Sequence, residues 1–184
     1  MKIRRALFLT HRWLGVILCL FMAMWFLSGV VMMYVGYPKL TQTERLATLP
    51  ALDATSCCIP LHDALAAAGT TDSKKMPRAA RLTSVSGTPR YVFTLDQNVR
   101  IAVDARTGRR IDKVTAVDAL ASARAFMPDT TAEYLGLVDE DAWTHSAALK
   151  PYRPLHRIQM RDSAGTTLYV ASNTAEVVRD ASRL

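Results

Sequence analysis

The stretch YVFTLDQNVRIAVDARTGRRI, residues 91–111, contains three strand-like segments joined by two polar turns. Apolar and polar residues alternate in its first two segments, which is the period of a half-buried β-strand. Gln97 and Asn98 suit a two-residue hairpin connection, and Gly108 stands at a turn position that needs a positive φ. A further alternating segment, RAARLTSV at residues 78–85, precedes the stretch. Together these residues predict an antiparallel sheet.

A predicted helix comes before each group of strands. PLHDALAAAG, residues 60–69, begins with proline and ends with glycine, which favour the two ends of a helix. TAVDALASARAFMP, residues 115–128, is predicted to form a longer amphipathic helix, followed by a strand at 142–149 and a hairpin around residues 163–165. The side chains of this longer helix that are expected to face the core are Val117, Leu120, Ala121 and Phe126.

The order of a helix and then strands occurs twice, and the strand endings are similar. IAVDARTGRRI, residues 101–111, and LYVASNTAEVV, residues 168–178, both consist of a strand, a polar turn and a short strand. The predicted fold class is α+β, with one N-terminal transmembrane helix and two small modules of a helix plus antiparallel strands. The predicted boundaries are 1–38 for the N-terminus and transmembrane helix, 39–59 for a linker with a short helix at 44–49, 60–114 for the first module and 115–184 for the second.

The N-terminal part contains one long stretch without charge. From Trp13 to Pro38 there is no Asp, Glu, Lys or Arg, and ~20 apolar residues are enough for a helix to cross a bilayer. This stretch is longer than the core of a signal peptide, and no small-residue cleavage site follows it. We therefore expect an uncleaved membrane anchor in contact with the lipid bilayer.

Most of the net charge of +7 belongs to this N-terminal part. Residues 1–39 contain five basic residues and no acidic residue, so the remaining 145 residues have a charge of only +2. Four of the five basic residues precede the apolar stretch, which predicts a cytoplasmic N-terminus and an exported C-terminal part. No basic face interleaved with aromatic residues is present, so nucleic acid is not an expected partner.

The exported part has no sequence signature of an enzyme, and whether the chain has enzymatic activity stays open. His62, His145 and His156 are scattered, and no hydrolase, zinc-protease or nucleotide-binding motif occurs. Cys57 and Cys58 are adjacent in a segment predicted to face an oxidising compartment. They could form a ring disulfide, bond to another chain or remain free thiols. A metal site that combines them with His62 lacks a recognised ligand spacing.

His11 is the strongest candidate for a functional residue. On a helix it shares a face with Gly15, Cys19 and Ala23, which recur every four residues. Small residues at this spacing allow another helix to approach closely, and a neutral imidazole is a good axial ligand for haem iron. Two interpretations stay open for His11, haem ligation and interfacial anchoring. Its neighbours Arg12 and Trp13 are expected to be interface anchors only.

The same residues carry a resemblance to a known family. HRWLGVILCLFMAMWFLSGVVMMY, residues 11–34, combines His-Arg-Trp-Leu-Gly, an apolar run and Ser-Gly before its end. Residues 91–111 and 168–180 are similar to the strand–turn–strand ending of a PepSY module. The chain resembles the PepSY-associated transmembrane proteins, which include iron-regulated inner-membrane proteins and ferric-siderophore reductases. The resemblance covers nearly the whole chain.

The resemblance implies a protein of the bacterial inner membrane with two periplasmic PepSY-like modules. It implies that haem b is held between several membrane helices, with His11 as one axial ligand and a histidine of another helix as the second. Family members usually continue with further membrane helices, so the chain is expected to be an N-terminal fragment or to work with another subunit that supplies them. A periplasmic protein or a ferric-siderophore is the implied partner of the modules.

Two functions follow from these observations. The first is a part of a haem-containing system that reduces ferric iron or ferric-siderophores, with the periplasmic modules as docking domains. The alternative is a non-enzymatic, membrane-tethered PepSY protein that binds a peptide, a protease or a membrane partner in the envelope.

Overall fold

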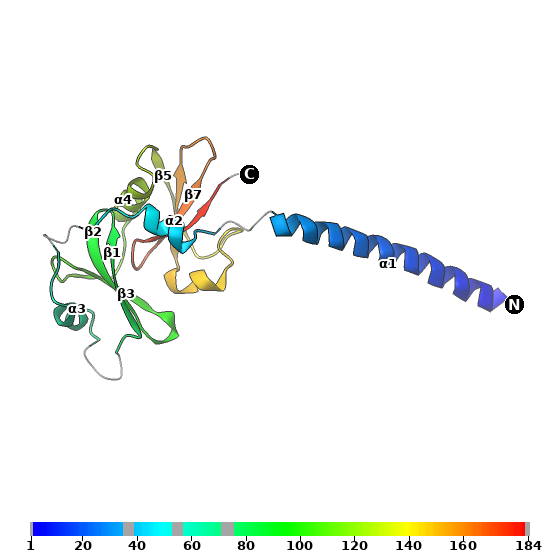
Figure 1. Ribbon diagram of the computed structural model, residues 1–184, viewed down its shortest axis with the longest axis horizontal. Coiled ribbons are helices and arrows are strands. Elements are labelled where there is room, and N and C mark those ends of the chain that lie inside the picture. Colours follow the sequence, from blue (N-terminus) through cyan, green and yellow to red (C-terminus); the bar gives the residue numbers. More distant parts are fainter. Residues whose placement is uncertain (1, 35–38, 53–56, 71–75, 183–184) are drawn as a thin grey trace. The chain divides into compact units, whose positions relative to one another are not determined.

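The computed structural model describes residues 2–34, 39–52, 57–70 and 76–182, which form two units (Figure 1). The first unit, Met1–Tyr37, contains the helix α1, and the second, Pro38–Leu184, contains every other element. The fold class is α+β, with a long apolar N-terminal helix and two four-stranded antiparallel sheets.

Helix α1 runs from Lys2 to Tyr34. Its span Ile3–Tyr34 is long and apolar enough to cross a membrane, and no other helix of the described residues meets this criterion. At ~1.5 Å per residue, the charge-free part from residue 13 to residue 34 extends for about 33 Å, which matches the hydrocarbon core of a bilayer. Pro38, the predicted end of the transmembrane segment, lies outside the described residues.

Sheet A has the strand order β1-β2-β3-β4, and each strand is antiparallel to its neighbours. Its strands are β1 Ala79–Val85, β2 Thr88–Thr94, β3 Arg100–Asp104 and β4 Arg110–Ile111. The connection between β2 and β3 is the three-residue 3-10 helix η2, Asp96–Asn98, in which Gln97 and Asn98 have left-handed backbones with φ of 58° and 59°. Gly108 has a φ of 73°. The predicted hairpin and the glycine turn are confirmed, but the predicted two-residue connection is wrong by one residue.

Helix α3, Leu61–Ala67, covers one face of sheet A. Its small residues Ala64 and Ala68 pack against Phe93 of β2 and Val103 of β3, and all four are buried. Because alanine side chains are short, the helix backbone can lie close to the large Phe93 ring. The helix predicted between Pro60 and Gly69 is confirmed.

Sheet B has the order β5-β6-β7-β8, again antiparallel throughout. Its strands are β5 Ala132–Val138, β6 Leu155–Met160, β7 Thr167–Ala171 and β8 Val177–Ala181. Helix α4, Ala116–Phe126, lies beside β5, β6 and β7 (Figure 1). Its first turn is closed by a capping box in which Thr115 and Asp118 bond to each other's backbone N–H groups.

Two sequence-based predictions for this half are wrong. Residues 142–149 do not form a strand but a turn followed by the 3-10 helix Ala147–Tyr152. Strand β6 pairs with β7 and, on its other side, with β5, whose pairing register shifts between Tyr134 and Gly136. The predicted inward face of α4 is right for Leu120 and Phe126, which pack against the core, but wrong for Val117, which is 75% exposed, and for Ala121, which is also exposed. Small residues of α4 make the closest contacts with the sheet, and these are Ala119, Ser122 and Ala123.

The two strand endings that look alike in sequence have the same backbone hydrogen bonds. Gly108 N–H donates to Asp104 O after β3, and Ala175 N–H donates to Ala171 O after β7, both at 2.9 Å. Ala175 has a φ of 59°, although it carries a side chain where the first half has glycine. The likeness between residues 101–111 and 168–178 is therefore structural.

The segments that lead into α3 and α4 are attached to these turns in the same way. Ile59 N–H donates to Ala105 O at 2.7 Å before α3, and Val114 N–H donates to Ser172 O at 2.9 Å before α4. Each bond places the start of a helix beside the turn of its own sheet. Both halves thus repeat one helix-on-sheet arrangement.

Residues 39–52 belong to the second unit rather than to a free linker. Helix α2, Gln42–Ala47, begins with a capping box between Thr41 and Glu44, and Leu40 packs against the core of sheet B and α4. The predicted short helix is confirmed, with its bounds two residues earlier in the chain. We call residues 40–50 the strap.

Candidate functional site

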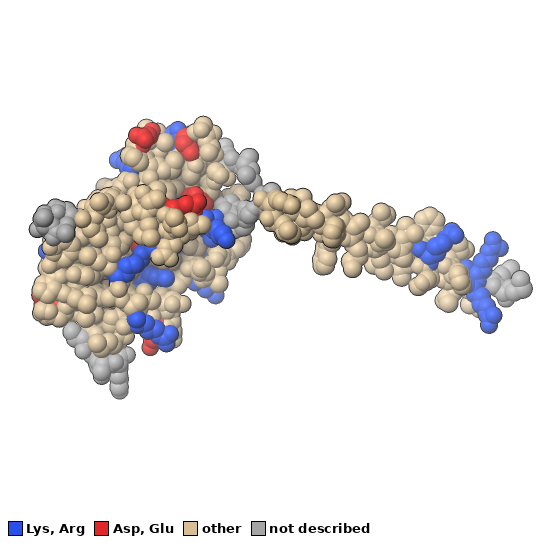
Figure 2. Space-filling model, in the orientation of Figure 1, with Lys and Arg blue, Asp and Glu red and all other residues tan. Residues whose placement is uncertain are grey.

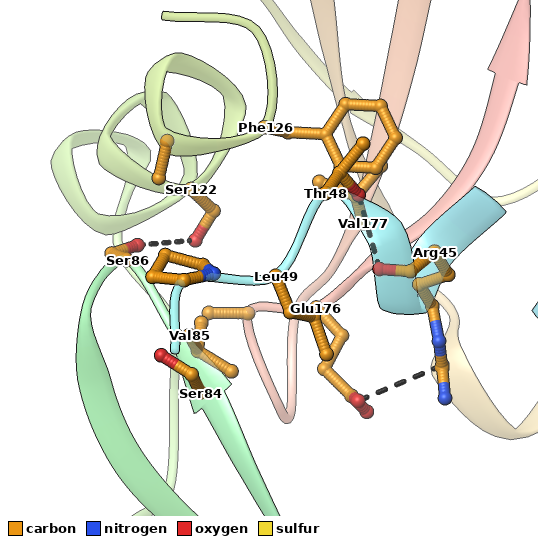
Figure 3. A pocket seen from close by; sticks show the side chains of 13 residues that line it. Arg45, Thr48, Leu49, Ser84, Val85, Ser86, Ser122, Phe126, Glu176 and Val177 are labelled. Carbon is orange, nitrogen blue, oxygen red and sulfur yellow. Dashed lines mark hydrogen bonds and ion pairs between the residues drawn. The ribbon is translucent and has the colours of Figure 1, made fainter. Parts of the chain in front are cut away.

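The strap closes a pocket where sheet A meets sheet B and α4 (Figure 3). Four segments line this junction pocket, namely Arg45 and 48–50 of the strap, 84–86 at the end of β1, Ser122, Ala125 and Phe126 of α4, and 175–177 before and in β8. The strap side chain Leu49 and the ring of Phe126 give it apolar walls. The space left inside is about 30 Å³, which is room for little more than one water molecule.

Glu176 is the charged group at the floor of this pocket. Only 5% of it is exposed. Its Oε1 accepts a 2.7 Å hydrogen bond from Arg81 Nη2 of β1, and Arg45 Nη1 of the strap lies 3.6 Å from the same oxygen. Its second oxygen, Oε2, is buried and has no hydrogen-bond partner among the described residues. One oxygen of the carboxylate therefore links the segment before β8 to β1 and to the strap. The other oxygen can accept a hydrogen bond from a further donor.

Arginines of sheet A hold the two halves together around this carboxylate. Arg90 Nη1 donates to Thr174 O at 3.0 Å, and the Arg100 guanidinium stacks on the Tyr152 ring at 3.9 Å. Burial lowers the pKa of Arg90 from its ordinary value, although an arginine remains charged near neutral pH. Figure 2 shows basic side chains gathered on the face that carries β1 and β3. The junction is thus rich in arginine, and Glu176 is its buried counter-charge.

The hydroxyl groups of the pocket serve structural contacts. Ser122 Oγ donates to Asp118 O one turn earlier in α4, at 3.0 Å, so its proton is used. Ser86 Oγ lies 3.0 Å from Ser122 Oγ and must be the donor of that bond. A serine nucleophile needs a base that removes its proton, whereas these two protons go to oxygens of the fold. The pocket is better suited to binding than to nucleophilic catalysis.

His156 lies in the core between sheet B and the segment before α4. Its position in β6 corresponds to that of Tyr91 in β2, because both pair with the equivalent valines of the next strand. Tyr91 OH donates to Ile59 O at 3.0 Å, and His156 Nε2 lies 3.2 Å from the equivalent carbonyl of Val114. A carbonyl oxygen can only accept, so Nε2 carries the proton.

The second ring nitrogen of this histidine is also engaged. Tyr134 OH lies 2.9 Å from His156 Nδ1, and the hydroxyl must donate because Nδ1 is unprotonated in this tautomer. Burial lowers the pKa of His156, against an opposing effect of the Val114 carbonyl. A neutral histidine with both nitrogens bonded to the fold is a structural residue rather than a catalytic base or a metal ligand.

Three carboxylates whose pKa is lowered are likewise used by turns and helix starts. Hydrogen bonds from Thr41 lower the pKa of Glu44, and those from Thr115 do so for Asp118. Thr166 has the same effect on the pKa of Asp162. A general acid at neutral pH needs a raised pKa, so the shifts of these groups run in the opposite direction. They act as ionised caps.

The residues proposed from sequence as a haem and packing face lie on α1. His11, Gly15, Cys19 and Ala23 are all exposed on this helix, and a Cβ built at Gly15 would meet nothing within 4 Å. This glycine is therefore not required by contacts within the described chain. Whether the face contacts another helix stays a prediction.

The two proposed anchors next to His11 contact each other. The Arg12 guanidinium lies 5.9 Å from the centre of the Trp13 ring, at the start of the charge-free part of α1. A cation over an aromatic face suits the polar boundary of a bilayer. Their role as interface anchors stays a prediction.

The remaining candidates are not brought together. His62 pairs with its neighbour Asp63 at 3.1 Å, and His145 pairs with Glu140. Cys57 and Cys58 are placed with their sulfur atoms together, as a vicinal pair. Within the ranges described, no group of three or more His, Cys, Asp or Glu side chains is placed to hold a metal ion.

Sequence analysis missed the junction pocket and its central residue. Glu176 follows Ala175 just as Arg109 follows Gly108, since the carbonyl groups of Glu176 and Arg109 accept equivalent backbone bonds after β7 and β3. The signal was therefore an acidic residue at the repeat position that holds a basic one. The partners Arg45 and Arg81 come from distant segments and have no such signal.

No protein-family model, curated protein or solved structure matches this chain. The resemblance to the PepSY-associated proteins therefore rests on the motifs quoted above.

Proposed function

We propose that this chain is a membrane-anchored docking protein of the PepSY type in the bacterial inner membrane. In this proposal, α1 is the anchor with its N-terminus in the cytoplasm, and the two helix-on-sheet halves are periplasmic modules that bind a protein partner without performing chemistry. The observation that carries the proposal is the junction pocket. It combines a strap that follows the anchor in the chain, a buried carboxylate with one oxygen that has no partner among the described residues, and a rim of arginines.

Orientation in the membrane is the direct test of the anchoring. Protease added to intact spheroplasts that express the chain is expected to digest the unit of residues 39–184 and to leave α1 protected, because the positive charges before the helix hold the N-terminus inside. A cytoplasmic marker protein that stays intact is the control for leakage. Complete protection of the unit until the spheroplasts are lysed would contradict the proposal.

A second candidate function is favoured by the place of His11. It lies about two helical turns inside the α1 span, between Thr10 and Arg12, on an apolar surface that Leu7, Phe8 and Leu14 also form. These residues fit one side of a haem b site, with His11 as one axial ligand. The second ligand and the opposite wall would come from further membrane helices of this protein or of another subunit. Bound haem would supply electron transfer to ferric iron or to a docked ferric-siderophore.

The haem proposal has a spectroscopic test. The protein purified from membranes is expected to give the bands of a haem b in a reduced-minus-oxidised spectrum. His11→Ala is expected to abolish at least ~80% of the intensity of these bands, because a required axial ligand of the haem is lost. His62→Ala is the matched control, because that histidine is exposed and paired with Asp63. Equal bands in both variants, or no bands in the parent protein, would remove the role of His11.

A further inference from the structure

The contacts of the strap with the junction pocket are incomplete in three ways. Arg45 Nη1 approaches Glu176 Oε1 only to 3.6 Å, which is an ion pair but longer than a hydrogen bond. Glu176 Oε2 is buried without a partner among the described residues. A space of about 30 Å³ remains under the strap. Another ligand could form a shorter ion pair with Glu176, donate a hydrogen bond to its second oxygen and fill the remaining space.

The chemistry of that ligand follows from the walls of the pocket. A buried carboxylate with a free oxygen favours an arginine, whose guanidinium can bond to both oxygens at once. Leu49 and Pro50 of the strap share the pocket with Phe126, Val85 and Val177, so an apolar residue larger than leucine would fill the remaining space. The matching ligand is a peptide segment with an arginine and, four residues later, a bulky apolar side chain.

We propose that the junction pocket is the peptide-binding groove of this protein and that the strap is its built-in competitor. The occupant is a segment of a partner polypeptide that resembles the strap, LTQTERLATLP at residues 40–50, but makes the contacts that the strap leaves unmade. Because the strap follows α1 in the chain, its displacement would lengthen the free segment between α1 and the modules. The proposal rests on the docking function above and names the chemistry of its partner.

The strap and the groove belong to the same chain, which explains why the groove would be blocked in the isolated protein. A tethered segment acts at an effective concentration in the millimolar range, so a free peptide of the same sequence must compete against it. Loosening the strap should therefore uncover binding without creating any new contact.

The test uses the full chain in detergent micelles and a fluorescently labelled peptide of the strap sequence. Arg45→Ala combined with Leu49→Ala weakens the binding of the strap to the pocket. Fluorescence anisotropy is expected to show that this variant binds the peptide at least ~10-fold more tightly than the parent chain does, because a competitor at millimolar effective concentration is removed. The matched control is Arg78→Ala with Val99→Ala, which removes an exposed arginine and an exposed apolar residue outside the pocket. It should bind the peptide like the parent chain.

Changes in the peptide test the chemistry without touching the protein. A peptide with Arg45→Glu would place a carboxylate against Glu176 and should lose binding, while a peptide with Leu49→Phe should bind more tightly. Failure of the strap peptide to bind the loosened variant, or equal binding of the Arg and Glu peptides, would overturn the proposal. Dimerisation of the loosened variant without peptide binding would also overturn it. None of these results depends on the orientation in the membrane, so this proposal and the anchoring fail independently.

Discussion

Glu176→Gln is expected to lower the free energy of unfolding of the unit at residues 39–184 by about 2–4 kcal/mol, somewhat less than the ~3–5 kcal/mol for breaking a fully buried ion pair, because Arg81 is 37% exposed. The amide keeps the shape of the side chain, so no cavity is made. It loses the negative charge that balances Arg81 at 2.7 Å and Arg45 at 3.6 Å. Those guanidinium groups, together with Arg90, would then repel each other at the junction.

Urea unfolding of the full chain in micelles, followed by far-UV circular dichroism, measures this loss. Glu133→Gln is the matched control, because Glu133 makes the same type of pair with Arg161 but both side chains are exposed. Exposed pairs contribute about 0–1 kcal/mol, so this variant should unfold close to the parent chain. Equal losses in the two variants would show that burial at the junction adds nothing to the pair.

His156→Ala is expected to lower the free energy of unfolding by about 2–6 kcal/mol. The reason is that the Val114 carbonyl and the Tyr134 hydroxyl, which bond to its two ring nitrogens, would stay buried without those partners, at about 1–3 kcal/mol each. Only 2% of His156 is exposed, so the lost ring volume adds a cavity. His62→Ala, which removes an exposed histidine, should change the stability by no more than about 0.5 kcal/mol.

The same variant also tests a dependence on pH. Because burial lowers the pKa of His156 in the folded chain, the unfolded chain binds a proton first as the pH falls below the ordinary histidine value of about 6.5. The contribution of His156 is therefore fully present above that pH and is lost below it, with a slope of at most ~1.4 kcal/mol per pH unit. His156→Ala should remove this slope, whereas His62→Ala should keep it. An unchanged profile between pH 5 and 7 would show that His156 does not titrate in this way.

The acidic caps act in a different pH range. The pKa values of Asp118 and Asp162 are lowered in the folded chain, so their stabilisation is present above the ordinary value of aspartate, about 3.9, and is lost as the pH falls through the folded value. The two effects are separated by more than one pH unit, and the slope near pH 6 can be assigned to histidine.

Local patterns in the sequence were enough for much of the fold. The alternation in residues 91–105, the Gln97-Asn98 connection and the Gly108 turn each depend on contacts between near neighbours, so the hairpins of sheet A could be read directly. The likeness of residues 101–111 and 168–178 predicted the repeat, and the backbone bonds of Gly108 and Ala175 confirm it. The charge-free run after Arg12 predicted α1 in the same way.

Other features depended on distant parts of the chain. Strand β5 was missed because its exposed positions carry Leu135 and Leu137, so its apolar and polar residues do not alternate in the sequence. Its partner β6 begins only at Leu155. The inward face of α4 was misplaced in part, because close packing on the sheet selects the small Ala119 and Ala123 over the larger Val117. Neither choice is visible within a short window of sequence.

The sequence by itself determined the long apolar N-terminal helix, most of the strands and their repetition, since these follow from hydropathy and backbone preferences that act over a few residues. Only the tertiary structure decided where the charges meet. Arg45, Arg81 and Glu176 are far apart in the chain and join at one buried carboxylate because the strap and both sheets converge there. The candidate site exists only where these segments meet, because the energy of a buried charge depends on the groups that surround it in space.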